Sequence, residues 1–228
     1  MELRPTVYIR AFAGLLFLLV VMAAAVFIAA WTVDYWQAWL FLAVFAVASL
    51  AITLYLMKED PELLERRVRA GPVAEHERGQ KIIQSLASVA FIATLVVPGI
   101  DHRLGWSTVP AWAVFAGDAL VALGFLVVFF VFRENTFASA TIGVEAGQRA
   151  ISTGPYAFVR HPMYAGAILL FVGTPLLLGS WYGLIGAAII MALFCVRITI
   201  EERTLRAELE GYTEYAAGVP YRLIPGVW

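Results

Sequence analysis

The residues best suited to chemistry lie in two polar stretches near the C-terminus, on either side of a long apolar run. The first stretch ends in Arg160-His161-Pro162, and Pro162 suits the first turn of a helix because its missing N–H costs nothing there. His161 would then lie at the helix N-terminus, whose free N–H groups and positive dipole end favour a carboxylate, such as the amino-acid end of a cofactor. The structural alternative is a histidine that only caps the helix.

The second polar stretch contains Arg197, Glu201 and Glu202. Arg197 and Glu201 are four residues apart and therefore share one face of a helix. A carboxylate at this place could bind ribose hydroxyls or an amino group, and an arginine could hold an anionic acceptor. The bland alternative is an interfacial ion pair where a helix leaves a membrane.

The apolar run between these stretches, residues 163–200, is too long for one membrane crossing and is interrupted at Gly179-Ser180. We therefore predict that it forms a tight hairpin of two helices. A hairpin returns the chain to the side from which it started. Four side chains should consequently converge at one membrane surface: His161, Tyr164, Arg197 and Glu201.

Composition indicates that lipid is the main solvent of this chain. Hydrophobic residues make up 61% of the 228 residues, charged residues make up 14%, and the mean hydropathy is +0.81. Soluble proteins are closer to about half apolar and about a quarter charged. Crossing about 30 Å of hydrocarbon takes roughly 20 apolar residues in a helix. Runs of that length lie at 11–31, 35–57, 81–100 and 111–132.

With the hairpin, these runs predict an all-α integral membrane protein of about six transmembrane helices, with a cytoplasmic C-terminal amphipathic helix. We assign residues 1–132 to a transmembrane scaffold of four helices and residues 133–228 to a cofactor-binding catalytic region. The charged loop at 58–80 should contain an amphipathic interfacial helix that begins near Pro61.

The basic residues predict how the helices are oriented in the membrane. With six crossings, both termini and the loops 58–80 and 133–162 lie on one side, and of the 16 Lys and Arg only Arg103 falls on the other. This bias follows the positive-inside rule and places both termini in the cytoplasm. We expect a multi-pass protein of a bacterial inner membrane or an endomembrane.

Nucleic acid and metal are not expected as partners. The net charge of −1 gives no basic excess for nucleic acid. Cys195 is the single cysteine and cannot form an internal disulfide or half of a zinc site, and the three histidines lie far apart in sequence.

The polar stretches resemble a known family. Three motifs carry the resemblance: Gly154-Pro-Tyr-x-x-x-Arg160-His161-Pro162-x-Tyr164-x-Gly166, then Arg197-x-x-x-Glu201-Glu202-x-x-Leu205, then Tyr212-x-x-Tyr215 with Val219-Pro220. They are similar to the isoprenylcysteine carboxyl methyltransferase family and to the related phospholipid N-methyltransferases. The similarity covers about residues 133–228. It implies an S-adenosylmethionine-dependent enzyme that methylates a lipid-like or prenylated small-molecule acceptor among membrane lipids.

The resemblance also implies roles for individual residues. It makes Arg197 the arginine that orients the acceptor, and Glu201 a base if the acceptor is an amine or a thiol. A carboxylate acceptor needs no base. The residues expected to contact the cofactor are Thr141, Gln148, Arg149, Ala150, Ile151, Tyr156, His161, Pro162, Met163, Tyr164, Glu201 and Glu202.

Several functions remain as alternatives at this point. Carboxyl O-methylation of an isoprenylcysteine-like acceptor is the first reading, and N-methylation of a phospholipid or S-methylation of a thiol are its variants. A membrane reductase of the steroid 5-reductase type would use NADPH instead. A transporter or assembly factor is disfavoured, because the charged residues gather at one surface rather than along a midplane pathway.

Overall fold

The computed structural model describes residues 3–68, 78–138, 143–144 and 147–228, and the regular structure in these residues is helical. This confirms the predicted all-α fold class. The elements in chain order are α1 (Leu3–Ala30), α2 (Trp36–Glu59), α3 (Pro61–Val68), α4 (Arg78–Leu104), α5 (Ala111–Glu134), η2 (Gly154–Ala157), α6 (Pro162–Leu177), α7 (Gly183–Glu208) and α8 (Tyr212–Gly218).

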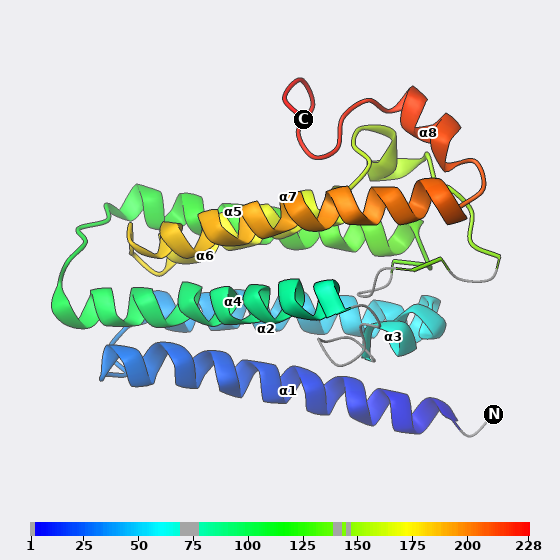
Figure 1. Cartoon of the computed structure of the whole chain (residues 1–228). Coiled ribbons are helices and arrows are strands. Elements are labelled where there is room, and N and C mark those ends of the chain that lie inside the picture. The colour runs from blue at the N-terminus through cyan, green and yellow to red at the C-terminus, as the bar shows by residue number, and fades with distance from the viewer. Residues whose placement is uncertain (1–2, 69–77, 139–142, 145–146) are drawn as a thin grey trace.

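The long helices lie side by side and share one direction in space. Figure 1 shows the N-terminus, α3 and α8 at one end of this bundle, with the turns between the long helices at the other. By length and composition, α1, α2, α4, α5 and α7 are each able to cross a membrane. The remaining predicted span, which lies between α5 and α7 in the chain, is α6, a shorter apolar helix of 16 residues.

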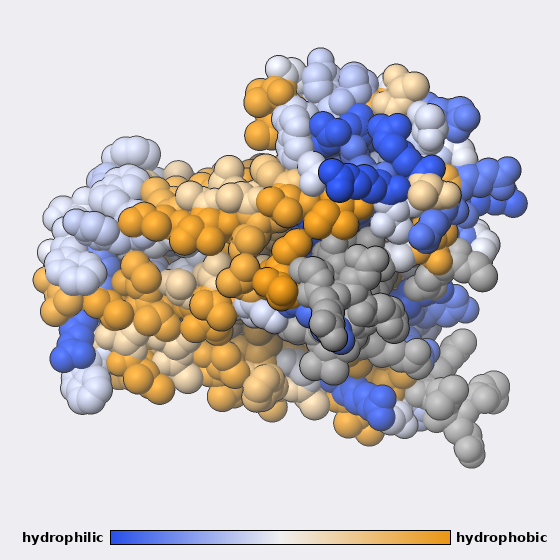
Figure 2. Space-filling view, viewed as in Figure 1, coloured by the Kyte–Doolittle hydropathy of each residue, from blue (hydrophilic) through white to orange (hydrophobic). Residues whose placement is uncertain are grey.

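The outer surface of the bundle fits a membrane environment. Large apolar side chains such as Phe17, Val47, Val89 and Ile185 are exposed along the long helices. Figure 2 shows hydrophobic residues over the middle of the bundle and hydrophilic residues at its ends, most densely at the end that holds α8. Exposed apolar area on this scale is costly in water and favourable against lipid chains, so the predicted integral membrane class is confirmed.

The predicted hairpin is formed by α6 and α7. Gly179 adopts a left-handed φ of +71°, a conformation that glycine reaches without steric cost, and the amide of Ser180 donates to the carbonyl of Pro175. At the tip, the buried carboxylate of Asp101 accepts hydrogen bonds from the hydroxyls of Ser107 and Ser180. These bonds join the turn of the hairpin to the end of α4.

The ends of the helices near the site follow local sequence. The α7 helix continues past the apolar run, which ends at residue 200, and reaches Glu208 because helix-forming Glu, Arg and Leu residues follow that run. The helix predicted in the charged loop is present as α3, which begins at Pro61, and its place at the membrane interface stays a prediction. The α5 helix crosses the predicted domain boundary at 132/133, and that division stays a prediction.

Glycines allow α5 and α6 to approach closely. A Cβ atom on Gly117 would lie 2.4 Å from the backbone nitrogen of Leu177, and one on Gly173 would lie 2.6 Å from the carbonyl oxygen of Gly117. Gly124 and Gly166 meet in the same way nearer the polar end. Small residues at such positions let helix backbones pack together in membranes. The start of α6 is thereby fixed against α5.

Candidate active site

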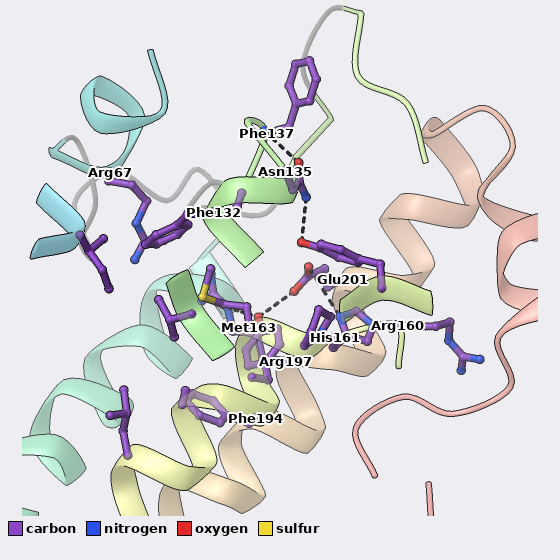
Figure 3. Close-up of a pocket in the computed structure, with 18 of the residues that line it drawn as sticks. Arg67, Phe132, Asn135, Phe137, Arg160, His161, Met163, Phe194, Arg197 and Glu201 are labelled. Carbon is purple, nitrogen blue, oxygen red and sulfur yellow. Dashed lines mark hydrogen bonds and ion pairs between the residues drawn. The ribbon is translucent and has the colours of Figure 1, made fainter. Parts of the chain in front are cut away.

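A cavity of about 590 Å³ lies between α2, α3, α4, α5, α6 and α7, near the end of the bundle that holds α8. This volume is typical of a site for a small organic ligand. Aromatic rings line its part within the bundle, including Phe41, Phe45, Phe91, Phe125 and Phe171. Polar side chains line the other part, and Figure 3 shows Asn135, His161, Arg197 and Glu201 there. The cavity is therefore apolar toward the membrane interior and polar toward its surface.

The structure brings together the four side chains expected to converge. The hydroxyl of Tyr164 donates to Glu201 Oε2 at 2.7 Å, and Arg197 Nε donates to the Tyr164 oxygen at 3.1 Å. His161 Nδ1 lies 3.9 Å from Glu201 Oε1. Arg197 Nη1 also donates to Gln84 Oε1 on α4 at 2.9 Å. The guanidinium is thus held in place next to the carboxylate rather than free to turn away.

Most of the predicted cofactor residues line this one cavity, although their roles stay predictions. Thr141 lies outside the described residues, and Glu202 is absent from the described lining. The predicted residues that do line the cavity are Gln148, Arg149, Ala150, Ile151, Tyr156, His161, Pro162, Met163, Tyr164, Arg197 and Glu201.

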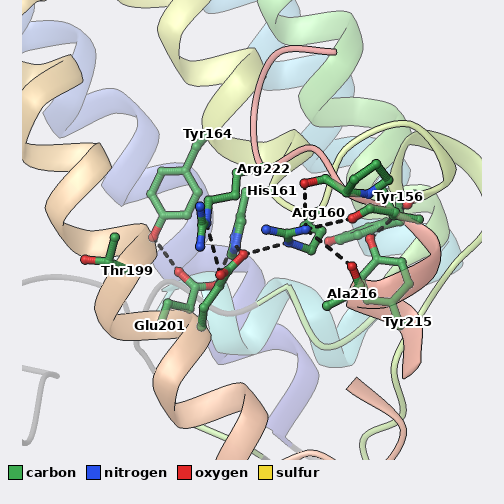
Figure 4. A network of polar contacts seen from close by, with 12 residues as sticks. Tyr156, Arg160, His161, Tyr164, Thr199, Glu201, Tyr215, Ala216 and Arg222 are labelled. Atoms are coloured by element: carbon green, nitrogen blue, oxygen red, sulfur yellow. Dashed lines mark hydrogen bonds and ion pairs between the residues drawn. The ribbon is translucent and has the colours of Figure 1, made fainter. Parts of the chain in front are cut away.

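Glu202 belongs instead to a buried network beside the cavity. Its Oε1 accepts from Arg160 Nε at 2.7 Å, and both side chains are 5% exposed. Its Oε2 accepts from Arg222 Nε at 3.0 Å, and His161 Nε2 lies 3.4 Å from Oε1. Figure 4 shows Arg160, His161 and Arg222 converging between the start of α6 and the C-terminal tail. Glu202 therefore contacts His161 from outside the described lining of the cavity.

Backbone hydrogen bonds attach the C-terminal tail to the same place. The amides of Arg160 and His161 donate to the carbonyls of Tyr221 and Arg222, both at 2.9 Å. Arg160 Nη1 donates to the carbonyl of Val219 at 2.7 Å. The His161 side chain makes no capping hydrogen bond to α6, so the capping alternative for this residue is wrong. Its ring lies between Glu201 and Glu202 of α7.

Tyr156 forms another part of the polar wall. Asn135 Nδ2 donates to the Tyr156 oxygen at 2.8 Å, and the Tyr215 hydroxyl donates to the Tyr156 carbonyl at 2.8 Å. Burial raises the pKa of Tyr156 to about 12, so its phenol is neutral at physiological pH. The Tyr156 phenol therefore adds no charge to the polar wall.

Tyr212 has a buried hydroxyl that is available to a ligand. The side chain is 3% exposed and lines the cavity, and its oxygen has no hydrogen-bond partner within the described part of the chain. Burial raises the pKa of Tyr212, so the hydroxyl keeps its proton. An unsatisfied buried hydroxyl is costly, and a bound polar group would remove that cost.

Sequence reasoning gave no role to several residues of this site. Gln84 and Arg67 come from α4 and α3, far from the motifs in sequence, and nothing in their local pattern marks them. Asn135 and Tyr212 lie in or near the motifs, but their side-chain directions depend on the fold. Across the described residues, no cluster of three or more His, Cys, Asp or Glu side chains could hold a metal ion.

Comparisons with known proteins agree with the predicted resemblance. A family model described as phospholipid methyltransferase matches residues 112–210, which include α5, α6, α7 and most of the polar wall. The chain is therefore similar to membrane methyltransferases over part of its length. A protein-S-isoprenylcysteine O-methyltransferase of Schizosaccharomyces pombe is 36% identical over 72 residues. That match covers 31% of this chain and 30% of the yeast protein, so the chain aligns with under a third of that relative's length.

The buried network around Glu202 predicts a loss of stability when it is broken. Glu202→Ala should lower the free energy of unfolding by about 3–5 kcal/mol, because the Arg160 guanidinium would stay buried without its partner. Chemical unfolding of the purified protein in detergent measures this. Glu62→Ala is the control, because it removes a 3.7 Å contact of an 82% exposed side chain with Arg66 and should cost less than about 1 kcal/mol. Equal stabilities of the two variants would contradict the role given to the network.

Proposed function

We propose that the protein is an S-adenosylmethionine-dependent methyltransferase that acts at the membrane on a lipophilic acceptor. The observation that carries the proposal is a single cavity with two kinds of wall. Its polar wall offers a carboxylate and an unpaired hydroxyl, and its apolar wall lies among transmembrane helices. The relatives named above are methyltransferases, which supports the same reaction class.

The residues present fit this cofactor. Glu201 offers a carboxylate to ribose hydroxyls or to an amino group, and Tyr212 offers the hydroxyl that lacks a partner. The segment 148–151 lines the same part of the cavity and can add backbone contacts. When bound, S-adenosylmethionine supplies an electrophilic methyl group on its sulfonium. The protein then has to align the acceptor with that methyl group and exclude water.

Arg197 is the residue we propose for holding the acceptor. Its contacts with Tyr164 and Gln84 fix the guanidinium at the boundary between the polar and apolar walls. It can orient a carboxylate by a pair of parallel hydrogen bonds. An isoprenylcysteine-like carboxyl group is the acceptor we favour, with the hydrocarbon chain among the aromatic rings. If the acceptor is a phospholipid amine or a thiol, Glu201 would serve as the base.

Cofactor binding tests the proposal most directly. Isothermal titration calorimetry of the protein in detergent should show binding of S-adenosylmethionine and of its demethylated product. Tyr212→Phe should weaken that binding by about 3- to 10-fold, because one hydrogen bond contributes about 0.5–1.5 kcal/mol. Tyr182→Phe, on an exposed side chain at the far end of the bundle, is the matched control. Binding of NADPH in place of S-adenosylmethionine would favour the reductase alternative.

The acceptor can be identified with the same protein. Incubation with methyl-labelled cofactor and fractionated membrane lipids and proteins should label one class of amphiphile, and the labelled atom distinguishes O-, N- and S-methylation.

Arg197 and Glu201 should show separable defects although they share one helix face. Glu201→Ala should chiefly weaken cofactor binding, by about 1.5–3 kcal/mol, because it removes a charge-assisted contact. Arg197→Ala should leave cofactor affinity nearly unchanged and sharply lower turnover, because the acceptor loses the group that positions it. Arg197→Lys should rescue poorly, since an ammonium cannot reproduce the guanidinium fork. If both alanine variants keep full activity and full cofactor affinity, the assignment is wrong and Arg197 and Glu201 are only an interfacial ion pair.

We also propose that both termini face the cytoplasm. The start of α1, α3 and α8 lie at one end of the bundle, and Arg103 lies near the other end on α4. In a Cys195→Ala background, a cysteine placed at position 103 should react with a membrane-impermeant reagent from the non-cytoplasmic side. Reaction from the cytoplasmic side alone would reverse the orientation.

A further inference from the structure

Arg67 lines the cavity from α3, and it lies outside the sequence motifs and outside the region that matches the family model. Arg67 lies near the end of this short helix, which is anchored by the buried side chains of Leu63 and Leu64. Its guanidinium carbon lies 5.1 Å from the centre of the Phe132 ring. Figure 3 shows Arg67 beside Phe132, on a different helix from Arg197 and Glu201.

The partners of Arg67 distinguish it from Arg160 and Arg197, the two buried arginines of the lining. Arg160 is paired with Glu202, and Arg197 is held by Tyr164 and Gln84. No carboxylate of the described residues lies within ion-pair distance of Arg67, whose one described contact is the face of Phe132. Burial lowers the pKa of this guanidinium, yet an arginine side chain keeps its charge in proteins. A partly buried cation that lacks an anion is costly unless a ligand provides one.

The charge of the cavity favours an anionic ligand. Arg160 is compensated by Glu202 beside the cavity, so among the described lining residues the arginines at positions 67, 149 and 197 face one carboxylate, that of Glu201. Phe132, which Arg67 contacts, belongs with Leu56 and Leu64 to one buried apolar cluster, and all three line the cavity. Such surroundings strengthen a charge-assisted hydrogen bond, and the guanidinium fork matches the oxygens of a phosphate or a carboxylate.

We propose that Arg67 binds an anionic group of the acceptor, a phosphate or carboxylate that is separate from the atom receiving the methyl group. The proposal rests on the proposed function and narrows its substrate class to amphiphiles that carry an anionic group besides the reacting one. A phospholipid amine meets this requirement through its phosphate, and an isoprenylcysteine-like carboxyl acceptor meets it only where the molecule has a second anionic group. Arg197 positions the reacting group from α7, and Arg67 holds the head from α3. The hydrocarbon chain lies along the aromatic wall between α2, α5 and α6.

Four single-chain probes with the same hydrocarbon chain test this binding: hexadecyl phosphate, palmitate, hexadecylphosphocholine and hexadecanol. Their affinity for the full-length protein in a neutral detergent can be measured by native mass spectrometry. The wild type should bind at least one of the two anionic probes about tenfold or more tightly than hexadecanol. The stronger of these two probes identifies the anion as phosphate or carboxylate.

Arg67→Gln should remove that preference, with a loss of about 10-fold or more for the anionic probes and little change for hexadecanol. Arg67→Lys should keep part of it, because the charge remains while the fork is lost. Arg66→Gln is the matched control on the same helix. Arg66 is absent from the described lining and donates to the carbonyl of Thr136 at 2.8 Å, so its substitution should leave the preference intact.

Three results would overturn the proposal. One is an unchanged preference in Arg67→Gln, and another is an equal loss for all four probes in both Arg67→Gln and Arg67→Lys. The third is a selective loss of S-adenosylmethionine binding in Arg67→Gln, which would assign the arginine to the cofactor instead. A wild type that binds anionic amphiphiles but no S-adenosylmethionine would contradict the methyltransferase proposal alone, so the two failures are distinguishable.

Discussion

The buried ion pair between Arg160 and Glu202 is the contact on which the candidate site depends. It joins three segments that are distant in sequence: the start of α6, the end of α7 and the C-terminal tail. His161 contacts the same carboxylate. Glu201, which precedes Glu202 on α7, lines the cavity. A pair this buried gives limited net stability compared with an apolar contact, but it leaves few alternative arrangements for the groups around it.

The sequence predicted those features that depend on local patterns. The hairpin followed from an apolar run with a Gly-Ser break, and α3 followed from a proline before a charged stretch. Glu201 and Glu202 were both predicted to contact the cofactor, but consecutive residues on a helix are rotated by about 100° and the two side chains take different directions. One glutamate faces the cavity and the other faces the tail. Gln84, Arg67 and the hydroxyl of Tyr212 required the packed structure, because their neighbours come from other helices.

The two walls of the cavity meet where the membrane surface is expected. Residues at the start of α6 and the end of α7 supply charge and hydrogen bonds, and the aromatic rings of α2, α5 and α6 supply an apolar volume. Placing both walls in one cavity lets a charged group and a hydrocarbon chain of the same molecule each meet a suitable environment. The protein therefore need not extract its ligand fully into water.

The glycine contacts between α5 and α6 restrict where a ligand can enter the cavity from the bilayer. Backbone atoms of these helices are so close at Gly117 and Gly173 that even a methyl group does not fit between them. A hydrocarbon chain is at least as wide as a methyl group, so a lipid chain cannot pass between α5 and α6 at these glycines. An amphiphile that enters the cavity sideways from the bilayer therefore has to pass between other helices.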